Sequence, residues 1–409
     1  MILSAHSSAH PLVLDGDFFG NPYPAYAAIR EAGNKPVEVV LETGMAYLPP
    51  GLRAWLLTSY EDIELALGDP RFRKELDKAM AVFGHASQDA VLYDNMANND
   101  PPNHTRLRKP LNGAFTARAA SSRRDDVRAV AHRVLDELAG VTEFDLVEDF
   151  ALPFSIEVIC GLLGVPVADR HTFASWAQTI TSAASKEDLR RDAGLMAAYL
   201  RDLMAAKRSS EDEDVLALLA RHPGITEREG VSQAYALLVA GYETTANLIA
   251  AGLLALESEP GLRKRLWTDP ALVPGAVQEM LRHQSPFNLS LYRYVSEDVE
   301  VGGTLIPAGS IVFLAFAAAN RDEQRFGDPD AFDVDRPGGD HIAFGGGVHN
   351  CIGKHLAKVE AEVAFEALIE RCPDLEIRTS RAELEWKPSP TFRGVRHLLV
   401  GPGPAEVAR

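Results

Sequence analysis

The sequence predicts a mainly α-helical protein that also contains small antiparallel β hairpins. Residues 103–284 show the periodicity of amphipathic helices, with breaks at Gly164–Pro166 and at Arg221–Gly224. After Pro286, short alternating stretches are separated by a glycine pair and by a Pro-Ala-Gly turn, which is typical of hairpins. Because the chain has no internal repeat and no linker, we expect one large domain over residues 1–409.

Helical and β segments alternate along this domain. A helix over Tyr23–Glu31 precedes strands around Val37–Glu42 and Ala54–Thr58, and Ser59 is expected to cap the next helix. The expected β-rich portions are about 35–60, 287–320 and 374–400, and the expected helical portions are about 60–286 and 351–371.

The longest apolar segment runs from Val231 to Glu257 and is preceded by a capping box made by Thr226 and Glu229. As a helix it would measure roughly 40 Å, enough to cross a bilayer. However, Glu243 lies near its middle, and a carboxylate at that depth costs several kcal/mol. The segment therefore predicts a buried core helix and no membrane anchor.

Composition limits the partners and the compartment. Lys and Arg number 41 against 58 Asp and Glu, which gives a formal charge of −17, so nucleic acid is not expected as a partner. Three distant cysteines argue against a disulfide framework. Residues 1–15 lack the features of a secretion signal. We therefore expect a cytoplasmic protein.

One cysteine stands at the start of a predicted helix. The stretch FGGGVHNCIG, residues 344–353, places Cys351 directly before an amphipathic helix over Lys354–Arg371. Free N–H groups at a helix N-terminus favour a thiolate, which can act as a metal ligand or as a nucleophile. The glycines permit tight turns and close approach of a flat group. His349 is a cation-capable donor two residues away.

Simpler interpretations of the cysteines were compared with this one. Cys160 and Cys372 are expected to be buried core thiols. Structural zinc would require close cysteine pairs, and the sequence contains no C-x-x-C motif. A phosphate loop would require Ser or Thr after Gly353-Lys354, where this chain has His355. A Cys351 nucleophile with a histidine base remains an alternative.

FGGGVHNCIG resembles the haem-ligand loop of the cytochrome P-450 family, with the pattern F-x-x-G-x-[HR]-x-C-x-G. The resemblance extends from Asn21 to Leu398 and implies a P-450-like helical domain; Leu399 departs from the proline common at that point. It also implies that Cys351 is the metal ligand, a thiolate on haem b (iron protoporphyrin IX), and that Phe344 and Gly353 contribute to cofactor binding.

A second match lies in the long helix. Ala240-Gly-Tyr-Glu-Thr-Thr245 resembles the family signature A-G-x-[DE]-T-T, which places Ala240 against the cofactor and makes Glu243 and Thr244 the catalytic pair. Physically, Thr244 can bond the carbonyl of Ala240, and Gly241 weakens that turn, so we expect the helix to widen into a groove for dioxygen. Glu243 would relay protons.

Two further matches concern supporting residues. Glu279-Met-Leu-Arg282 resembles the family's E-x-x-R motif, and a downstream segment ends in Arg336. The resemblance implies that these three residues form an ion-pair network that supports the thiolate loop. Four cationic residues match positions that neutralise the haem propionates: His104, Arg108, Arg293 and His349.

The function expected from these matches is insertion of one oxygen atom from O2 into a C–H or C=C bond of a mostly apolar small molecule in secondary metabolism, of polyketide or macrolide type. Two alternatives are a haem-thiolate gas sensor or carrier without turnover and a peroxide-dependent peroxygenase. Neither has a use for the acid and alcohol pair.

The substrate pocket is the least determined part of the site. Aromatic and aliphatic residues would make it apolar, while Asn288 and Ser290 are expected as hydrogen-bond donors. The predicted lining residues are Phe83, Leu92, Val239, Phe287, Asn288, Leu289, Ser290, Thr391 and Phe392.

Electrons from NAD(P)H are expected to arrive through external redox proteins, because the sequence shows no second nucleotide-binding or flavin-binding module. A ferredoxin with its reductase, or a flavodoxin, is the expected partner of a monomeric enzyme. Since such partners are acidic, a local basic face is needed. The candidates are Arg106, Lys109, Lys354, His355 and Lys358.

Overall fold

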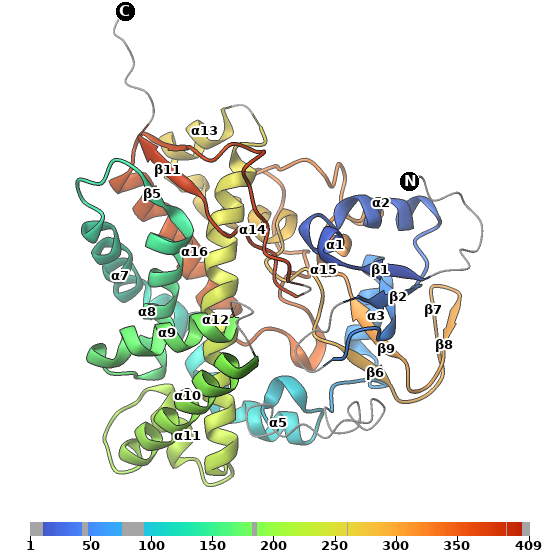
Figure 1. Ribbon diagram of the computed structural model, residues 1–409, viewed down its shortest axis with the longest axis horizontal. Helices are drawn as coiled ribbons and strands as arrows, with labels where there is room; N and C mark the ends of the chain where they lie inside the picture. The colour runs from blue at the N-terminus through green and yellow to red at the C-terminus, as the bar shows by residue number, and fades with distance from the viewer. Residues whose placement is uncertain are drawn as a thin grey trace, which may run out of the picture. The chain divides into compact units, whose positions relative to one another are not determined.

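The computed structural model describes residues 11–42, 48–75, 94–181, 186–259, 261–389 and 391–402, and these are mainly α-helical with small sheets (Figure 1). This confirms the predicted fold class. The chain divides into two compact units, each assembled from separate stretches of sequence. The first comprises Met1–Ser87, Ala250–Cys351 and Ser380–Arg396, and the second comprises Gln88–Ile249, Ile352–Thr379 and His397–Arg409.

The first unit is built on a six-stranded sheet. Its order is β1 (Leu12–Leu14), β2 (Val37–Leu41), β3 (Arg53–Leu57), β9 (Ile311–Leu314), β6 (Arg293–Val295) and β4 (Phe72–Arg73). Strands β7 (Val299–Val301) and β8 (Thr304–Ile306) form a predicted antiparallel hairpin. Strand β9 pairs antiparallel with β6 but parallel with β3. The sheet is therefore mixed, which the alternating sequence pattern did not predict.

The first unit also contains helices. They are α1 (Gly16–Gly20), α2 (Tyr23–Glu31), α3 (Tyr60–Gly68), α13 (Leu262–Thr268), α14 (Val273–His283) and α15 (Phe316–Ala319). Helix α2 has the predicted bounds, and Ser59 caps α3 as expected, its Oγ accepting from the N–H of Asp62 at 3.4 Å. The buried face of α3 packs Ile63 and Leu67 into one apolar cluster with sheet residues such as Val312.

The second unit is mostly helical. Its helices are α5 (Asn103–Arg108), α6 (Ala117–Ser122), α7 (Arg124–Glu137), α8 (Leu152–Leu163), α9 (Arg170–Thr181), α10 (Lys186–Lys207), α11 (Val215–Arg221), α12 (Glu227–Leu256) and α16 (Lys354–Arg371). A small antiparallel sheet has the order β10 (Leu375–Ile377), β11 (Leu399–Pro402) and β5 (Phe144–Asp145). Both predicted breaks occur: α8 ends at Gly164, whose φ is 83°, and α11 ends before His222.

Helix α12 is the core helix that the sequence predicts. Its capping box forms, with the N–H of Thr226 donating to Glu229 Oε2 at 2.9 Å and the N–H of Glu229 donating to Thr226 Oγ1 at 3.3 Å. Among the described residues, α12 is the one helix long and apolar enough to cross a membrane, and 72% of its apolar window is buried inside the protein. Burial of this kind is what a soluble core helix shows.

A row of ion pairs fixes α16, the helix after Cys351, to α7. Arg124 pairs with Glu362 at 2.7 Å, and Arg128 pairs with Glu366 at 2.9 Å. Arg124 also reaches Glu366. Single surface pairs contribute little, but residues that share partners lose less side-chain entropy for each pair formed. The row therefore fixes the direction in which α16 leaves the cysteine loop.

The glycines before Cys351 allow their loop to lie against α3. Gly345 and Gly347 have φ values of 63° and 61°, in the left-handed region. A Cβ at Gly347 would lie 2.1 Å from the carbonyl oxygen of Leu67, whereas a Cβ at Gly345 would lie 3.7 Å from Phe316 Cζ. At Gly347, both the positive φ and the close approach of the Leu67 carbonyl therefore require glycine. At Gly345, only the positive φ favours it. The cysteine loop is held on α3 at this point.

These two glycines allow a matched test. Both alanine substitutions cost about 1–2 kcal/mol because L residues disfavour this φ, and Gly347→Ala adds a backbone collision that Gly345→Ala does not. We expect a distinctly larger loss in the free energy of unfolding for Gly347→Ala, measured by urea denaturation followed by circular dichroism. Equal losses for the two variants would contradict the assigned close approach.

Candidate functional site

Short hydrogen bonds hold the loop that carries Cys351. The N–H of Cys351 donates to the Phe344 carbonyl at 2.9 Å. The Asn350 amide donates to the carbonyls of Phe344 and Gly345 at 3.2 and 3.1 Å. Cys351 is exposed, and helix α16 begins at Lys354 directly after its N-cap, Gly353. The structure therefore confirms a fixed, accessible thiol just before a helix.

The other two cysteines lie in different surroundings. Cys160 is completely buried, and burial raises the pKa of its thiol to about 12. Burial also raises the pKa of Cys372, which is only partly exposed. Both thiols therefore stay protonated at neutral pH, and Cys351 is the one cysteine whose surroundings suit a thiolate ligand.

The ligand set suits a cofactor that takes a single protein ligand. Nowhere in the described part of the chain do three or more His, Cys, Asp or Glu side chains gather as a metal cage. A structural zinc site needs four such ligands, so the described residues do not form one. A haem-thiolate centre takes only one cysteine ligand from the protein. The exposed Cys351 on its rigid loop fits that requirement.

Behind the loop lies a buried ion-pair network made by Glu279, Arg282 and Arg336. Arg282 donates through Nε and Nη2 to the two carboxylate oxygens of Glu279 at 2.8 and 2.7 Å. Arg336 Nε donates to Glu279 Oε1 at 3.2 Å. Arg282 and Glu279 are only 2% and 3% exposed. The three predicted residues therefore form one network, in which a single buried carboxylate pairs with two arginines.

Asn320 links this network to the cysteine loop, although no sequence motif pointed to it. Its carbonyl oxygen accepts from Arg282 at 2.8 Å, and its amide donates to Ser285 Oγ at 2.7 Å. Its side-chain oxygen accepts from the N–H of Ile342 at 2.8 Å. Asn320 is fully buried. One asparagine thus joins α14 to the chain that leads into Phe344 and Cys351.

Helix α12 carries the predicted acid and alcohol. Glu243 is 4% exposed, and Thr244 Oγ1 donates to the Ala240 carbonyl at 2.7 Å, as expected. The predicted widening of the helix is absent, because α12 is α-helical throughout its length. Gly241 has another purpose: a Cβ there would lie 2.9 Å from Ile159 Cδ1 on α8. The glycine lets two helices pack closely.

One stripe of α12 remains open although most of the helix is buried. Ala240 is exposed, and Val239 and Thr244 are partly exposed, while the turns on either side are buried. Ala240 and Thr244 lie four residues apart and therefore share a face. A small side chain beside a hydroxyl suits a flat group lying against this face.

A buried acid from α16 contacts the other side of α12. Glu360 is 3% exposed and shares a hydrogen bond with Thr245. Burial raises the pKa of Glu360 to about 8, although the bond to Thr245 acts in the opposite direction. The carboxyl is therefore protonated at neutral pH. Sequence reasoning missed this residue, since an isolated glutamate in an amphipathic helix looks like a surface residue.

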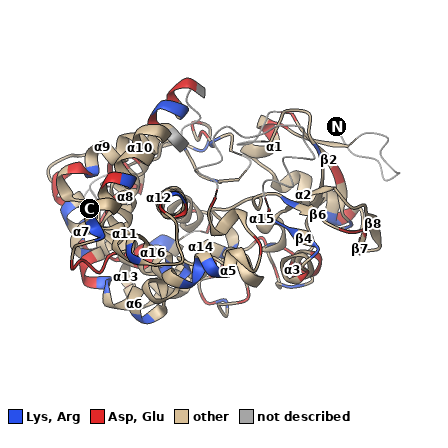
Figure 2. Ribbon diagram, turned by 90° about the horizontal axis from the view of Figure 1, so that it is seen from below, with Lys and Arg blue, Asp and Glu red and all other residues tan. Residues whose placement is uncertain are grey.

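The predicted propionate partners lie on several elements. His104 and Arg108 are close together on α5, where burial and then the Arg108 charge lower the pKa of His104. Figure 2 shows the basic residues of α5 in blue. Arg293, on β6, is 4% exposed and donates to the Phe72 carbonyl at 3.0 Å. His349 is partly exposed on the short helical turn Gly347–His349.

Two of the predicted pocket residues form an aromatic pair. The rings of Phe287 and Phe392 meet edge to face, with centroids 5.1 Å apart and an interplanar angle of 88°. Both rings are partly exposed. An edge-to-face contact stabilises the protein by about 0.5–1.5 kcal/mol beyond the contribution of the apolar area that the rings bury. The structure therefore joins two segments that the sequence placed in the pocket separately.

Other predicted pocket residues are buried or lie outside the described chain. Asn288 Oδ1 accepts from Tyr26 at 2.8 Å, and Ser290 Oγ accepts from the N–H of Leu314 at 3.1 Å. These bonds use the two oxygens as acceptors, and both side chains are buried, at 1% and 5% exposed. Their expected role as donors to a substrate stays a prediction. Leu289 is fully buried and Thr391 is 6% exposed. The predicted residues Phe83 and Leu92 lie outside the described residues.

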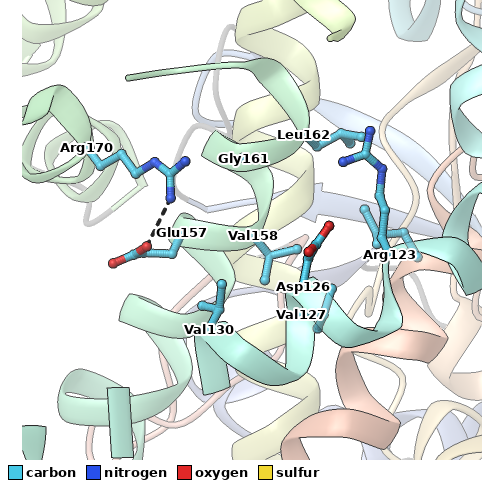
Figure 3. A pocket seen from close by; sticks show the side chains of 10 residues that line it. Arg123, Asp126, Val127, Val130, Glu157, Val158, Gly161, Leu162 and Arg170 are labelled. Atoms are coloured by element: carbon cyan, nitrogen blue, oxygen red, sulfur yellow. Dashed lines mark hydrogen bonds and ion pairs between the residues drawn. The ribbon is translucent and has the colours of Figure 1, made fainter. Parts of the chain in front are cut away.

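A surface cavity of about 250 Å³ lies elsewhere, between α7, α8 and the start of α9 (Figure 3). Apolar residues such as Val127, Val158 and Leu162 line it, and Arg170 reaches Glu157 at its edge. It contains none of the predicted site residues. Its volume is also below the roughly 300–1,000 Å³ typical of small-molecule pockets.

Comparisons with known proteins agree with the site. The family model described as Cytochrome P450 matches residues 199–381. Cytochrome P450 107B1 of Saccharopolyspora erythraea is 39% identical over 96% of this chain and 98% of its own. Mycinamicin IV hydroxylase/epoxidase of Micromonospora griseorubida is 37% identical over 86% of this chain and 90% of its own.

A solved structure shows the same fold. The tirandamycin C-bound P450 monooxygenase TamI superposes with a TM-score of 0.89 at 38% identity, covering 96% of this chain and 100% of that one. Identity at this level, over nearly the full length of both chains, goes beyond a shared fold. Together with the thiol loop and the Glu279 network, these matches show that the chain belongs to the cytochrome P450 family.

Proposed function

We propose that this cytochrome P450 hydroxylates or epoxidises a mostly apolar secondary metabolite of polyketide or macrolide type. As a member of its family, the chain is a monooxygenase that uses haem b, O2 and electrons from redox proteins. Two relatives support the substrate class by name, one a mycinamicin IV hydroxylase/epoxidase and the other solved with tirandamycin C. The partly exposed aromatic pair Phe287 and Phe392 offers a matching apolar surface.

The observation that carries the proposal is the single exposed thiol of Cys351 on a rigid loop. When bound, haem supplies the activation of O2, and a thiolate ligand favours cleavage of the O–O bond. Phe344, Gly353 and Ala240 would contribute to binding the haem, as the family resemblance implies. The positive charges of Arg108 and Arg293 and the imidazoles of His104 and His349 would bind the haem propionates.

Glu243 and Thr244 are proposed to deliver protons. The hydroxyl hydrogen of Thr244 is committed to the Ala240 carbonyl, so the oxygen of this side chain is held in place as an acceptor. Glu243 is an adjacent ionisable group on the same helix. A sensor or carrier would not require this pair, and the relatives are monooxygenases, so the sensor and peroxygenase alternatives are not supported.

A basic cluster at the start of α16 is proposed to receive the electron donor, which we assign as an acidic ferredoxin or flavodoxin. Lys354 and Lys358 lie close enough to His355 that their charges add to burial in lowering its pKa. Of the other predicted residues, Arg106 is engaged in an ion pair with Glu229. We further propose that the enzyme is a cytoplasmic monomer whose two units form one catalytic domain.

The thiolate assignment predicts a spectroscopic result. Reduced protein under carbon monoxide should show the strongly red-shifted Soret band that names the family, and Cys351→Ser should abolish it. Cys160→Ser and Cys372→Ser are the matched controls and should retain the band, since burial keeps those thiols protonated. Loss of the band in either control would mean that Cys351 is not the ligand.

The proton-delivery assignment predicts uncoupling. General acid–base assistance is worth about 10²- to 10⁴-fold in rate, so Thr244→Ala should release more hydrogen peroxide per NAD(P)H consumed and form less product. Thr268→Ala is the control, because Thr268 makes the same bond to a carbonyl four residues back on exposed α13. Unchanged coupling in Thr244→Ala would refute the role.

The proposed docking site predicts that the apparent KM for the electron donor depends on the charge of Lys354 and Lys358 and on salt. Lys354→Glu with Lys358→Glu should raise the apparent KM for an acidic ferredoxin several-fold at low ionic strength and leave substrate binding spectra unchanged. Lys35→Glu with Lys264→Glu makes the same change in net charge at two other exposed lysines. Equal effects of the two double variants on reduction rates would place the partner elsewhere.

A further inference from the structure

The segment that carries Phe287 is paired with the segment that carries Phe392. The N–H of Asn288 donates to the Thr391 carbonyl at 2.8 Å, and the N–H of Arg393 donates to the Pro286 carbonyl at 2.9 Å. The two phenylalanines themselves form an isolated antiparallel bridge. Because the segments are bonded on both sides of the aromatic pair, a shift of one backbone carries the other ring with it. We call the two rings the aromatic wall.

A tyrosine of helix α2 fixes one of these segments from behind. The hydroxyl of Tyr26 donates to Asn288 Oδ1 at 2.8 Å, and each residue is 1% exposed. Burial raises the pKa of Tyr26 well above its usual value, so this hydroxyl remains a donor. Asn288 is also bonded through its backbone, its carbonyl accepting from the N–H of Ala317 at 3.3 Å. Its position therefore depends on a bond from α2.

The second segment is fixed by a stack of rings and guanidinium groups. The Arg393 guanidinium lies 3.7 Å from the ring centre of Trp386 and 5.1 Å from that of Tyr23, one turn before Tyr26. Arg393 is 6% exposed and also donates to the Gly20 carbonyl at 3.0 Å. On Tyr23, the Arg321 guanidinium stacks at 3.8 Å.

We propose that helix α2 sets the position of the aromatic wall, with Tyr26 as a positioning residue that acts through Asn288. The inference rests on the proposed function, in which the wall faces the substrate. Helix α2 thereby tunes which apolar molecules fit, although its two tyrosines are bonded to the protein and not to the substrate. Selectivity would then change through substitutions behind the wall that leave Phe287 and Phe392 in place.

The test compares two azoles that both bind haem iron in the holoenzyme. Imidazole is too small to need the wall, whereas 4-phenylimidazole must place its ring against an apolar surface. Tyr26→Phe removes one hydroxyl and keeps the ring that packs against Phe18 and Tyr23. We expect the Kd for 4-phenylimidazole, from optical titration, to rise about three- to tenfold, since a buried acceptor loses its bond. The Kd for imidazole should stay the same.

A matched control separates positioning from simple loss of a hydrogen bond. Tyr60→Phe, on α3, likewise removes a hydroxyl that donates to a carbonyl, that of Asp340 at 2.6 Å, and leaves the wall segments untouched. Both variants are expected to lower the thermal midpoint, but only Tyr26→Phe should change the ratio of the two Kd values. A double-variant cycle then tests the route: in an Asn288→Leu background, Tyr26→Phe should cause no further change in that ratio.

The possible outcomes separate the two proposals. Three outcomes would overturn the positioning role while the red-shifted band persists. The ratio of the two Kd values could be unchanged in Tyr26→Phe, or it could change equally in Tyr26→Phe and Tyr60→Phe. It could also change fully when Tyr26→Phe is made in the Asn288→Leu background. Absence of that band in the unaltered protein would instead overturn the proposed function, and this inference with it. A selective change that disappears in the Asn288→Leu background supports the inference.

Discussion

The ion pair between Glu279 and Arg282 is the interaction on which the unit carrying Cys351 depends. Both groups are withdrawn from water, so loss of Glu279 would leave the Arg282 charge buried without its carboxylate, a change that typically costs about 3–5 kcal/mol. Arg282 uses its remaining donors on the carbonyls of Asn320, Pro329 and Ala331. One cation thus holds three carbonyls from two backbone segments, and through Asn320 it is linked to the chain that leads into the cysteine loop.

The parts of the structure that the sequence predicted are those encoded by local rules. The bounds of α2, the cap at Ser59 and the capping box before α12 depend on neighbouring residues, and each is confirmed. The network of Glu279 and Arg282 was predicted because two separate motifs match one family pattern. In the same way, the position of Cys351 before α16 follows from one short stretch of sequence.

The parts that were not predicted depend on which segments meet in space. Gly241 was read as a weak point in α12, yet its partner is Ile159, some eighty residues earlier in the sequence. The bond from Tyr26 to Asn288 was not predicted, because nothing near Asn288 in the sequence indicates Tyr26. The parallel pairing of β3 with β9 likewise joins strands that no local pattern relates. Isolated residues acquire such roles only from tertiary contacts.

The buried carboxyl of Glu360 makes folding itself a proton-binding step. In the unfolded chain this group is ionised above its ordinary pKa of 4.5, whereas in the folded chain it keeps its proton up to a pKa of about 8. Between those two values the native state binds more protons than the unfolded state, so this residue contributes less to the free energy of unfolding as the pH rises. The free energy of unfolding should therefore gain from this carboxyl under mildly acidic conditions and lose that contribution under alkaline ones.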